Sequence, residues 1–126
     1  VLGADTLVVL EGTILGKPAD PAEAAAMLRR LRGRAHQVLT AVALVDAAGG
    51  RARVGAGHTM VHLRPYAEAE LTAYVAGGDP LDKAGAYAIQ HAGFSPVARL
   101  EGSETNVIGL PLGLVATLLA ALERGL

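Results

Sequence analysis

Apolar positions along the chain fall into several short runs, which predict a small domain built from both strands and helices. Two runs, Thr6–Leu10 and Thr13–Leu15, are separated by the dipeptide Glu11-Gly12. A two-residue connection with glycine in second place is typical of a tight β-hairpin. The run 38–45 is apolar almost without interruption, which predicts a strand covered on both faces. Residues 1–5 likewise predict the interior of a buried strand.

The clearest helix signal follows this hairpin. Asp20 can cap a helix whose first residue is Pro21, and Glu23 completes a capping-box pattern. Gly33 is placed to end the helix. Its predicted buried face carries the apolar residues Ala24, Met27, Leu28 and Leu31. Four arginines lie near the end of this helix: Arg29, Arg30, Arg32 and Arg34. Their position favours the interpretation that they interact with the negative end of the helix dipole, and a phosphate-binding cluster is the alternative.

The second half of the chain continues the alternation of strands and helices. Residues 51–64 predict a long strand, in which Gly55 and Gly57 indicate a bulge, a bend or the close approach of another group. Pro96 indicates that a later strand lies at a sheet edge. The remaining predicted elements are a helix over 66–75, strands over 84–90 and 94–100, a loop over 102–106 and a helix over 111–122. This order predicts an α/β fold in which helices pack against the faces of a mixed sheet.

Composition narrows the class of protein further. The chain has 126 residues, of which 52% are hydrophobic, so it is long enough and apolar enough to fold as one domain. A net charge of −1 and an aromatic content of 3% argue against a nucleic-acid partner. The chain has no cysteine, which excludes disulfides and thiolate chemistry and fits a cytoplasmic location. Neither a membrane span nor a signal peptide is visible in the sequence, so no membrane partner is expected.

Familiar phosphate-loop and metal motifs do not match. Gly16-Lys17 is followed by Pro18, whereas a Walker A motif has Ser or Thr there. The pair Gly55 and Gly57 lies inside a predicted strand, whereas a dinucleotide fingerprint needs a strand-to-helix turn. His58 and His62 have a spacing that binds zinc on helices, but on a strand they are expected to face solvent.

Asp5 and Lys17 are the candidate reactive residues. Asp5 places a carboxylate at the mouth of an otherwise apolar strand, where a charge needs a partner or a metal ion. A hairpin between them would return Lys17 to the neighbourhood of Asp5. Such a pair can hold Mg²⁺ or activate water while the lysine neutralises a phosphate. The alternatives are a turn-capping aspartate and a surface lysine.

Gln90 is the third candidate, at the end of the predicted strand 84–90. A strand-end amide can donate to and accept from the edge of a nucleobase, although a capping or turn role is the more common use of such a residue. The dipeptide Asp82-Lys83 repeats the pairing of an acid with a base after Gly77 and Gly78.

Several segments, taken in order, resemble the Maf family of nucleoside triphosphate pyrophosphatases. The segments that carry the resemblance are Gly3-Ala4-Asp5-Thr6, Gly16-Lys17-Pro18, Leu31-Arg32-Gly33-Arg34, Val38-Leu39-Thr40, residues 82–90, Glu101-Gly102-Ser103 and residues 106–112. Together they cover almost the whole chain. The resemblance implies an elongated mixed sheet with flanking helices, similar to the inosine triphosphate pyrophosphatases, split by a substrate cleft.

The resemblance also implies an activity and roles for four residues. The activity would be hydrolysis of a nucleoside triphosphate to the monophosphate and pyrophosphate, helped by a divalent cation such as Mg²⁺ or Mn²⁺. Asp5 matches the family's proton acceptor and a metal ligand, and Lys17 matches a phosphate-binding lysine. Thr6 and Gln90 match positions tied to substrate choice. The form Ala-Tyr-Ala-Ile-Gln at 86–90 resembles the subfamily that acts on dTTP and UTP.

Two alternatives remain open beside this hypothesis. One is the same chemistry on a modified nucleotide such as 7-methyl-GTP, and the other is a nucleotide-binding regulator of septum formation with little turnover. The family's opening Ser-x-Ser-Pro-Arg-Arg segment has no counterpart before Asp5. We therefore expect residues 1–126 to be a single Maf-like domain that lacks this segment. The apolar C-terminal helix could pack inside the domain or pair with a second subunit, so a homodimer is compatible with the sequence.

Overall fold

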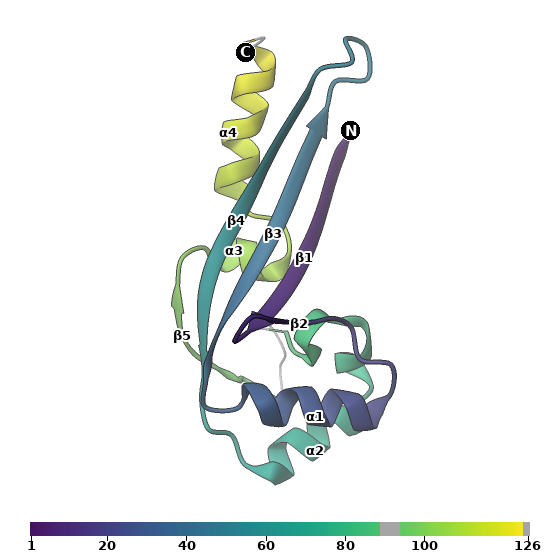
Figure 1. Ribbon diagram of the computed structural model, residues 1–126, viewed down its shortest axis with the longest axis vertical. Coiled ribbons are helices and arrows are strands. Elements are labelled where there is room, and N and C mark those ends of the chain that lie inside the picture. The colour runs from purple at the N-terminus through teal and green to yellow at the C-terminus, as the bar shows by residue number, and fades with distance from the viewer. Residues whose placement is uncertain (89–93, 125–126) are drawn as a thin grey trace.

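The fold is an antiparallel five-stranded sheet with helices packed against it (Figure 1). A computed structural model describes residues 1–88 and 94–124. The sheet order is β2-β1-β3-β4-β5. The strands are β1 (Leu2–Leu10), β2 (Thr13–Leu15), β3 (Ala35–Val45), β4 (Ala52–Leu63) and β5 (Val97–Glu101). The α-helices are α1 (Pro21–Leu31), α2 (Glu68–Ala76), α3 (Glu104–Ile108) and α4 (Leu112–Glu123), and two short 3₁₀ turns are η1 (Asp79–Asp82) and η2 (Ala84–Ala86). The predicted α/β class is confirmed.

The long strands β1, β3 and β4 form the spine of the molecule. They extend beyond the cluster of α1 and α2 at one end, and α4 packs along their other half (Figure 1). The hairpin predicted at Glu11-Gly12 is confirmed, since both residues have positive φ and Leu10 pairs with Thr13. The edge position predicted from Pro96 is also confirmed, because β5 ends the sheet.

Helix α1 begins and buries its face as the sequence predicts. The Asp20 side chain accepts a hydrogen bond of 2.7 Å from the backbone N–H of Glu23, and Gly33 with φ 69° follows the helix. The buried residues of α1 are Ala24, Met27, Leu28 and Leu31. They pack into the main core with Val8, Leu10, Tyr66, Leu71 and Tyr74. This core ties α1 and α2 to one face of the sheet.

Only one face of the sheet is covered, which corrects the prediction for the run 38–45. Along β3 the buried residues alternate with exposed or half-buried ones, as in a strand with one solvated face. Residues 2–5 of β1 are strand, but they are exposed. Apolar residues on the open face therefore made the sequence look more buried than the strand is.

Two local predictions are wrong for similar reasons. The described part of the predicted strand 84–90 contains η2, in which Gly85 and Ala86 have positive φ. The turn packs against β1, and a Cβ on Gly85 would lie 3.0 Å from Val8 Cγ1. The predicted loop 102–106 contains the start of α3, whose N-cap Ser103 accepts a hydrogen bond from the N–H of Asn106. Tertiary packing decides both short segments.

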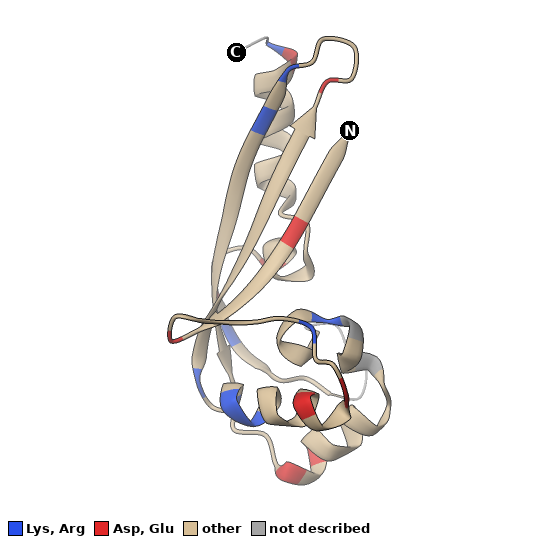
Figure 2. Cartoon of the chain, turned by 45° about the vertical axis from the view of Figure 1, so that its right-hand side comes forward, with Lys and Arg blue, Asp and Glu red and all other residues tan. Residues whose placement is uncertain are grey.

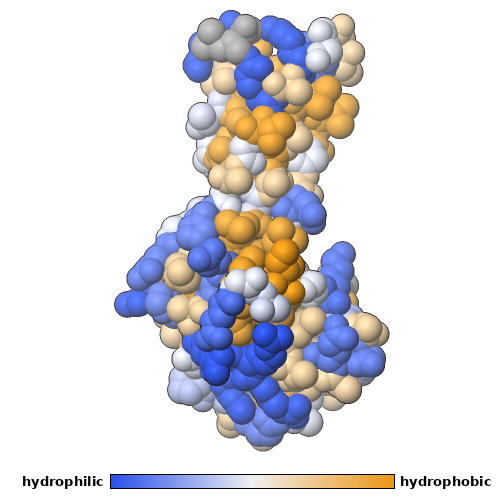
Figure 3. All heavy atoms as spheres, in the orientation of Figure 1, coloured by the Kyte–Doolittle hydropathy of each residue, from blue (hydrophilic) through white to orange (hydrophobic). Residues whose placement is uncertain are grey.

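Charge and hydropathy divide the molecule along its length. Charged residues gather on α1 and α2, whereas the middle of the three long strands carries few (Figure 2). Apolar residues occupy much of the visible surface at the waist and on the half that holds α4 (Figure 3). The ion pairs of Glu68 with Arg29 and Arg32 join α1 to α2. Among the described residues, no helix has the length and apolar character that crossing a bilayer requires.

Candidate functional site

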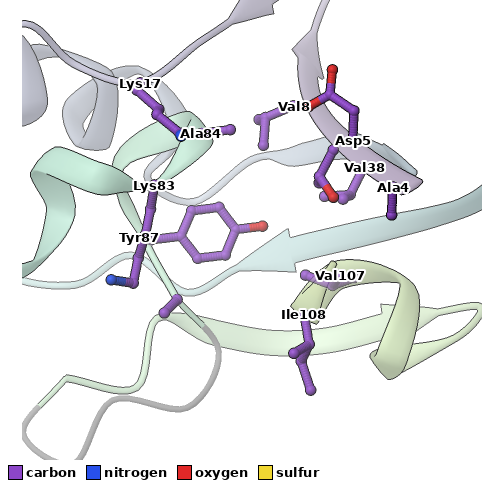
Figure 4. Close-up of a pocket in the computed structure, with 12 residues that line it drawn as sticks. Ala4, Asp5, Val8, Lys17, Val38, Lys83, Ala84, Tyr87, Val107 and Ile108 are labelled. Atoms are coloured by element: carbon purple, nitrogen blue, oxygen red, sulfur yellow. The ribbon is translucent and has the colours of Figure 1, made fainter. Parts of the chain in front are cut away.

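A pocket of about 460 Å³ opens where β1, the loop after β2, the η turns and α3 meet (Figure 4). The residues that line it are Ala4, Asp5, Thr6, Val8, Lys17, Val38, Lys83, Ala84, Tyr87, Ala88, Val107 and Ile108. Three of the four residues singled out from the sequence, Asp5, Thr6 and Lys17, therefore lie in one pocket. The fourth, Gln90, lies outside the described residues.

Asp5 reaches the pocket because it lies on an open part of β1. Strand β2 pairs with β1 only at Val8–Leu10, so no described strand covers the outer edge of β1 beside Asp5. The side chain of Asp5 is exposed and has no ion pair with any described residue. A carboxylate in this position can accept a proton from water or bind a cation.

The β1–β2 hairpin returns Lys17 to the same pocket. The carbonyl of Gly16, just before it, accepts a hydrogen bond of 3.1 Å from the N–H of Gly85 in η2. This bond ties the loop of Lys17 to the turn that follows Lys83, and both lysines line the pocket. Figure 4 shows Lys17 and Ala84 on one side of the pocket and Asp5 on the other. The ammonium group of Lys17 makes this wall suitable for a ligand that carries negative charge.

Tyr87 forms the floor between these walls (Figure 4). Its hydroxyl lies 2.6 Å from Nε2 of His36, a residue of β3 that is 2% exposed. Burial, and to a smaller extent the charge of His62, lowers the pKa of His36 to about 4, and burial raises the pKa of Tyr87. Both groups are therefore neutral at pH 7, and the floor carries no charge.

The opposite end of the pocket is apolar and is contributed by α3. Val107 and Ile108 line it together with Ala4 of β1. Thr6 belongs to this end, since its Oγ1 is the nearest atom, at 3.6 Å, to a Cβ built on Gly109. The pocket therefore has a cationic wall, a neutral floor and an apolar end, which suits a ligand with a phosphate group at one side and a ring at the other.

Several lining residues have no role that could be predicted from the sequence. Lys83 was noted as part of an acid–base pair, but it received no role because its position depends on the η turns. Tyr87, Val107 and Ile108 lie in segments that carry the family resemblance, but the sequence predicts no role for them. His58 is exposed, as predicted, and His62 is half-buried beside Arg99 and Glu101. Among residues 1–88 and 94–124, no three His, Cys, Asp or Glu side chains form a group that could hold a metal ion.

Comparison with known proteins identifies the family of the chain. The Maf-like protein family model matches residues 1–122. A dTTP/UTP pyrophosphatase of Moorella thermoacetica is 55% identical over 120 residues, which are 95% of this chain and 62% of that protein. A dTTP/UTP pyrophosphatase of Pelotomaculum thermopropionicum is 50% identical over 119 residues, 94% of this chain and 62% of that protein.

A third relative carries a broader name. The nucleoside triphosphate pyrophosphatase of Xylella fastidiosa is 53% identical over 124 residues, which are 98% of this chain and 65% of that protein. The chain thus spans less than two thirds of the length of these curated relatives. Because the family model matches nearly every residue, the chain belongs to the family of Maf-like proteins.

Proposed function

We propose that the protein hydrolyses dTTP and UTP to the nucleoside monophosphate and pyrophosphate, and that the pocket described above is its active site. The observation that carries the proposal is the meeting of Asp5 with Lys17 and Lys83 around a neutral floor. The names of the relatives, dTTP/UTP pyrophosphatase among them, support this class of substrate. We also propose that residues 1–126 form a single domain of a cytoplasmic protein. A homodimer is a further proposal, which a measurement of the molecular mass in solution tests.

In the proposed reaction, Asp5 is the general base. The Asp5 carboxylate takes a proton from a water molecule as the water oxygen bonds to the α-phosphorus. The bond between the α-phosphorus and the bridging oxygen breaks, and pyrophosphate leaves with the electron pair. Lys17 binds the phosphate oxygens, where an ammonium group offsets the charge that develops on the leaving group. The open edge of β1 beside Asp5 gives water access to this carboxylate.

The described donor set fits a divalent cation that is shared with the substrate. Asp5 is the only carboxylate among the described residues that line the pocket. Mg²⁺ is commonly held by one or two carboxylates together with substrate phosphates and water, so Asp5 would hold it with the nucleotide. A cation bound there would neutralise phosphate charge. We propose Mg²⁺ or Mn²⁺ in this place.

Substrate choice is proposed to depend on Thr6 and Gln90. Thr6 lies at the apolar end of the pocket, away from Lys17, which is where a nucleobase would lie if the phosphates contact the lysines. A primary amide such as that of Gln90 can donate an N–H to a ring carbonyl of uracil or thymine. A site built for such pairing rejects bases that leave its polar groups unpaired.

The direct test is pyrophosphate release by the complete protein from dTTP, UTP, CTP, 7-methyl-GTP and dITP, with Mg²⁺ or Mn²⁺. We expect the highest kcat/KM for dTTP and UTP. Preference for 7-methyl-GTP would contradict the proposed substrates but would agree with the proposed reaction. Nucleotide binding without turnover on any substrate would contradict the enzyme and favour a nucleotide-binding regulator.

A further inference from the structure

A chain of buried hydrogen bonds runs from the pocket into the sheet. The Oγ1 atoms of Thr6 and Thr40 lie 2.8 Å apart, on neighbouring strands β1 and β3. Thr40 Oγ1 in turn donates to the backbone carbonyl of Asn106 at 2.8 Å. Thr40 and Asn106 are both 0% exposed, so neither has water as an alternative partner. Only Thr6 belongs to the pocket lining.

The number of protons fixes the direction of these bonds. A carbonyl oxygen only accepts, so the single hydroxyl proton of Thr40 points to Asn106. Thr40 Oγ1 can then only accept from Thr6, and the proton of Thr6 is used in that bond. The Thr6 hydroxyl can therefore offer a ligand only its oxygen lone pairs. Thr6 is therefore an acceptor, and not a donor, toward the pocket.

The Asn106 carbonyl is held in place from several sides. The side-chain Nδ2 of Asn106 donates to the carbonyl of Val38 and to Thr59 Oγ1, each at 3.0 Å. Its backbone N–H donates to Ser103 Oγ at 3.2 Å. Gly57 packs so closely against the amide that a Cβ there would lie 2.9 Å from Asn106 Cγ. The acceptor that orients Thr40 has little freedom to move.

We infer that Thr40 is a positioning residue that makes Thr6 select a hydrogen-bond donor, and that this donor is the imide N–H of uracil or thymine. The inference rests on the proposed function and deepens it. Thr6 lies near Gly109 and the apolar end formed by Val107 and Ile108, opposite the lysine wall, which places a base and not a phosphate beside it. Uracil and thymine carry a proton on the ring nitrogen between their carbonyls, whereas cytosine has a lone pair there.

The test compares UTP with CTP in Thr40→Val, which removes the hydroxyl that accepts from Thr6. The freed Thr6 proton can then meet the cytosine lone pair. We expect the kcat/KM of UTP relative to CTP to fall about three- to tenfold, the effect of one neutral hydrogen bond, mainly through KM. Thr40→Ser keeps the hydroxyl and should keep the wild-type ratio.

Thr59→Val is the matched control. Thr59 is as buried as Thr40 and contacts the same Asn106, but it lies on β4, which β3 separates from the strand of Thr6. It should lower stability and leave the UTP to CTP ratio unchanged. An unchanged ratio in Thr40→Val, or an equal change in Thr59→Val, would overturn the inference. Absence of wild-type turnover on UTP would instead contradict the proposed function.

Two nucleotide analogues identify the donor. UTP methylated at N3 lacks the imide proton, and 3′-deoxy-UTP lacks a sugar hydroxyl. We expect the wild type to lose about three- to tenfold in kcat/KM with the N3-methyl analogue and little with the 3′-deoxy analogue. The opposite pattern would overturn the imide assignment in favour of the sugar. If Thr40→Val does not fold, Thr6→Val should lower the preference for UTP over CTP about three- to tenfold, and a preference equal to that of the wild type would refute the inference.

Discussion

Replacing Gly57 by alanine should destabilise the protein far more than an ordinary glycine-to-alanine change in a strand. The new Cβ would overlap Asn106 Oδ1 and lie 2.9 Å from Asn106 Cγ and 3.3 Å from Pro111 Cβ. Asn106 cannot give way at no cost, because its amide donates to Val38 and Thr59 inside a fully buried site. We therefore expect both a shift of β4 away from α3 and the loss of at least one hydrogen bond of the amide.

The magnitude follows from two opposing effects. Overpacking a well-filled site costs about 1–3 kcal/mol, and a buried polar group that loses its partner costs a similar amount. Alanine in a strand recovers about 0.5–1 kcal/mol relative to glycine. We therefore expect Gly57→Ala to lower the free energy of unfolding by about 2–4 kcal/mol.

Urea unfolding at equilibrium measures this loss, with two glycines as controls. Gly3 lies in β1 with nothing within 4 Å of a built Cβ, so Gly3→Ala should be neutral or slightly stabilising. A Cβ on Gly55 would meet only side-chain methyls of Leu114 and Leu118, the nearest at 3.0 Å, and these can rotate, so its cost should be intermediate. A Gly57→Ala variant as stable as Gly3→Ala would refute the reasoning.

Two further variants test the pocket and its floor. Lys17→Gln should lower kcat/KM about 10- to 100-fold, because a hydrogen bond to a charged group is lost. The midpoint of urea unfolding should stay the same. Unchanged kinetics would show that Lys17 does not contribute to the site. His36 binds a proton near pH 6.5 when unfolded but only near pH 4 in the folded protein, so acidification through this window favours the unfolded state by about 3 kcal/mol. Urea unfolding at pH 7.0, 5.5 and 4.5 should show this loss, and His36→Gln should show less of it; equal pH dependence in both proteins would contradict the neutral His36.

Long periodic segments could be predicted from sequence because local signals and packing agree there. The cap at Asp20, the apolar face of α1 and the turn at Gly33 all indicate the same helix, and the structure contains it. Gly55 and Gly57 indicated a bulge, a bend or a close approach, and the structure shows close approach of Leu114 to Gly55 and of Asn106 to Gly57. In such segments the local residues are enough to predict the element.

The segments predicted wrongly depend on distant residues. The run from Ala84 is apolar enough for a strand, but Gly85 donates to Gly16 and packs on Val8, which favours a turn with positive φ. Short apolar runs are ambiguous without such contacts. The Ser103 cap of α3 had a local signal that could have been used.

The candidate site divides in the same way. The sequence indicated Asp5, Thr6 and Lys17, and the β1–β2 hairpin brings them to one pocket. Thr40 and Asn106 gave no local signal, since a threonine inside an apolar strand and an asparagine after a turn are ordinary residues. Their role depends on the packing of β1, β3 and α3, which allows only one direction for each hydrogen bond between Thr6, Thr40 and Asn106.

The most direct test of the account is turnover of dTTP by Asp5→Asn in the complete protein with Mg²⁺. Asparagine has the shape of aspartate but cannot accept the proton of the attacking water. We expect pyrophosphate release to fall about 10²- to 10⁴-fold, while dTTP binding measured by calorimetry in the absence of Mg²⁺ is retained. Turnover of the variant at the wild-type rate would contradict Asp5 as the base and, with it, the proposed active site.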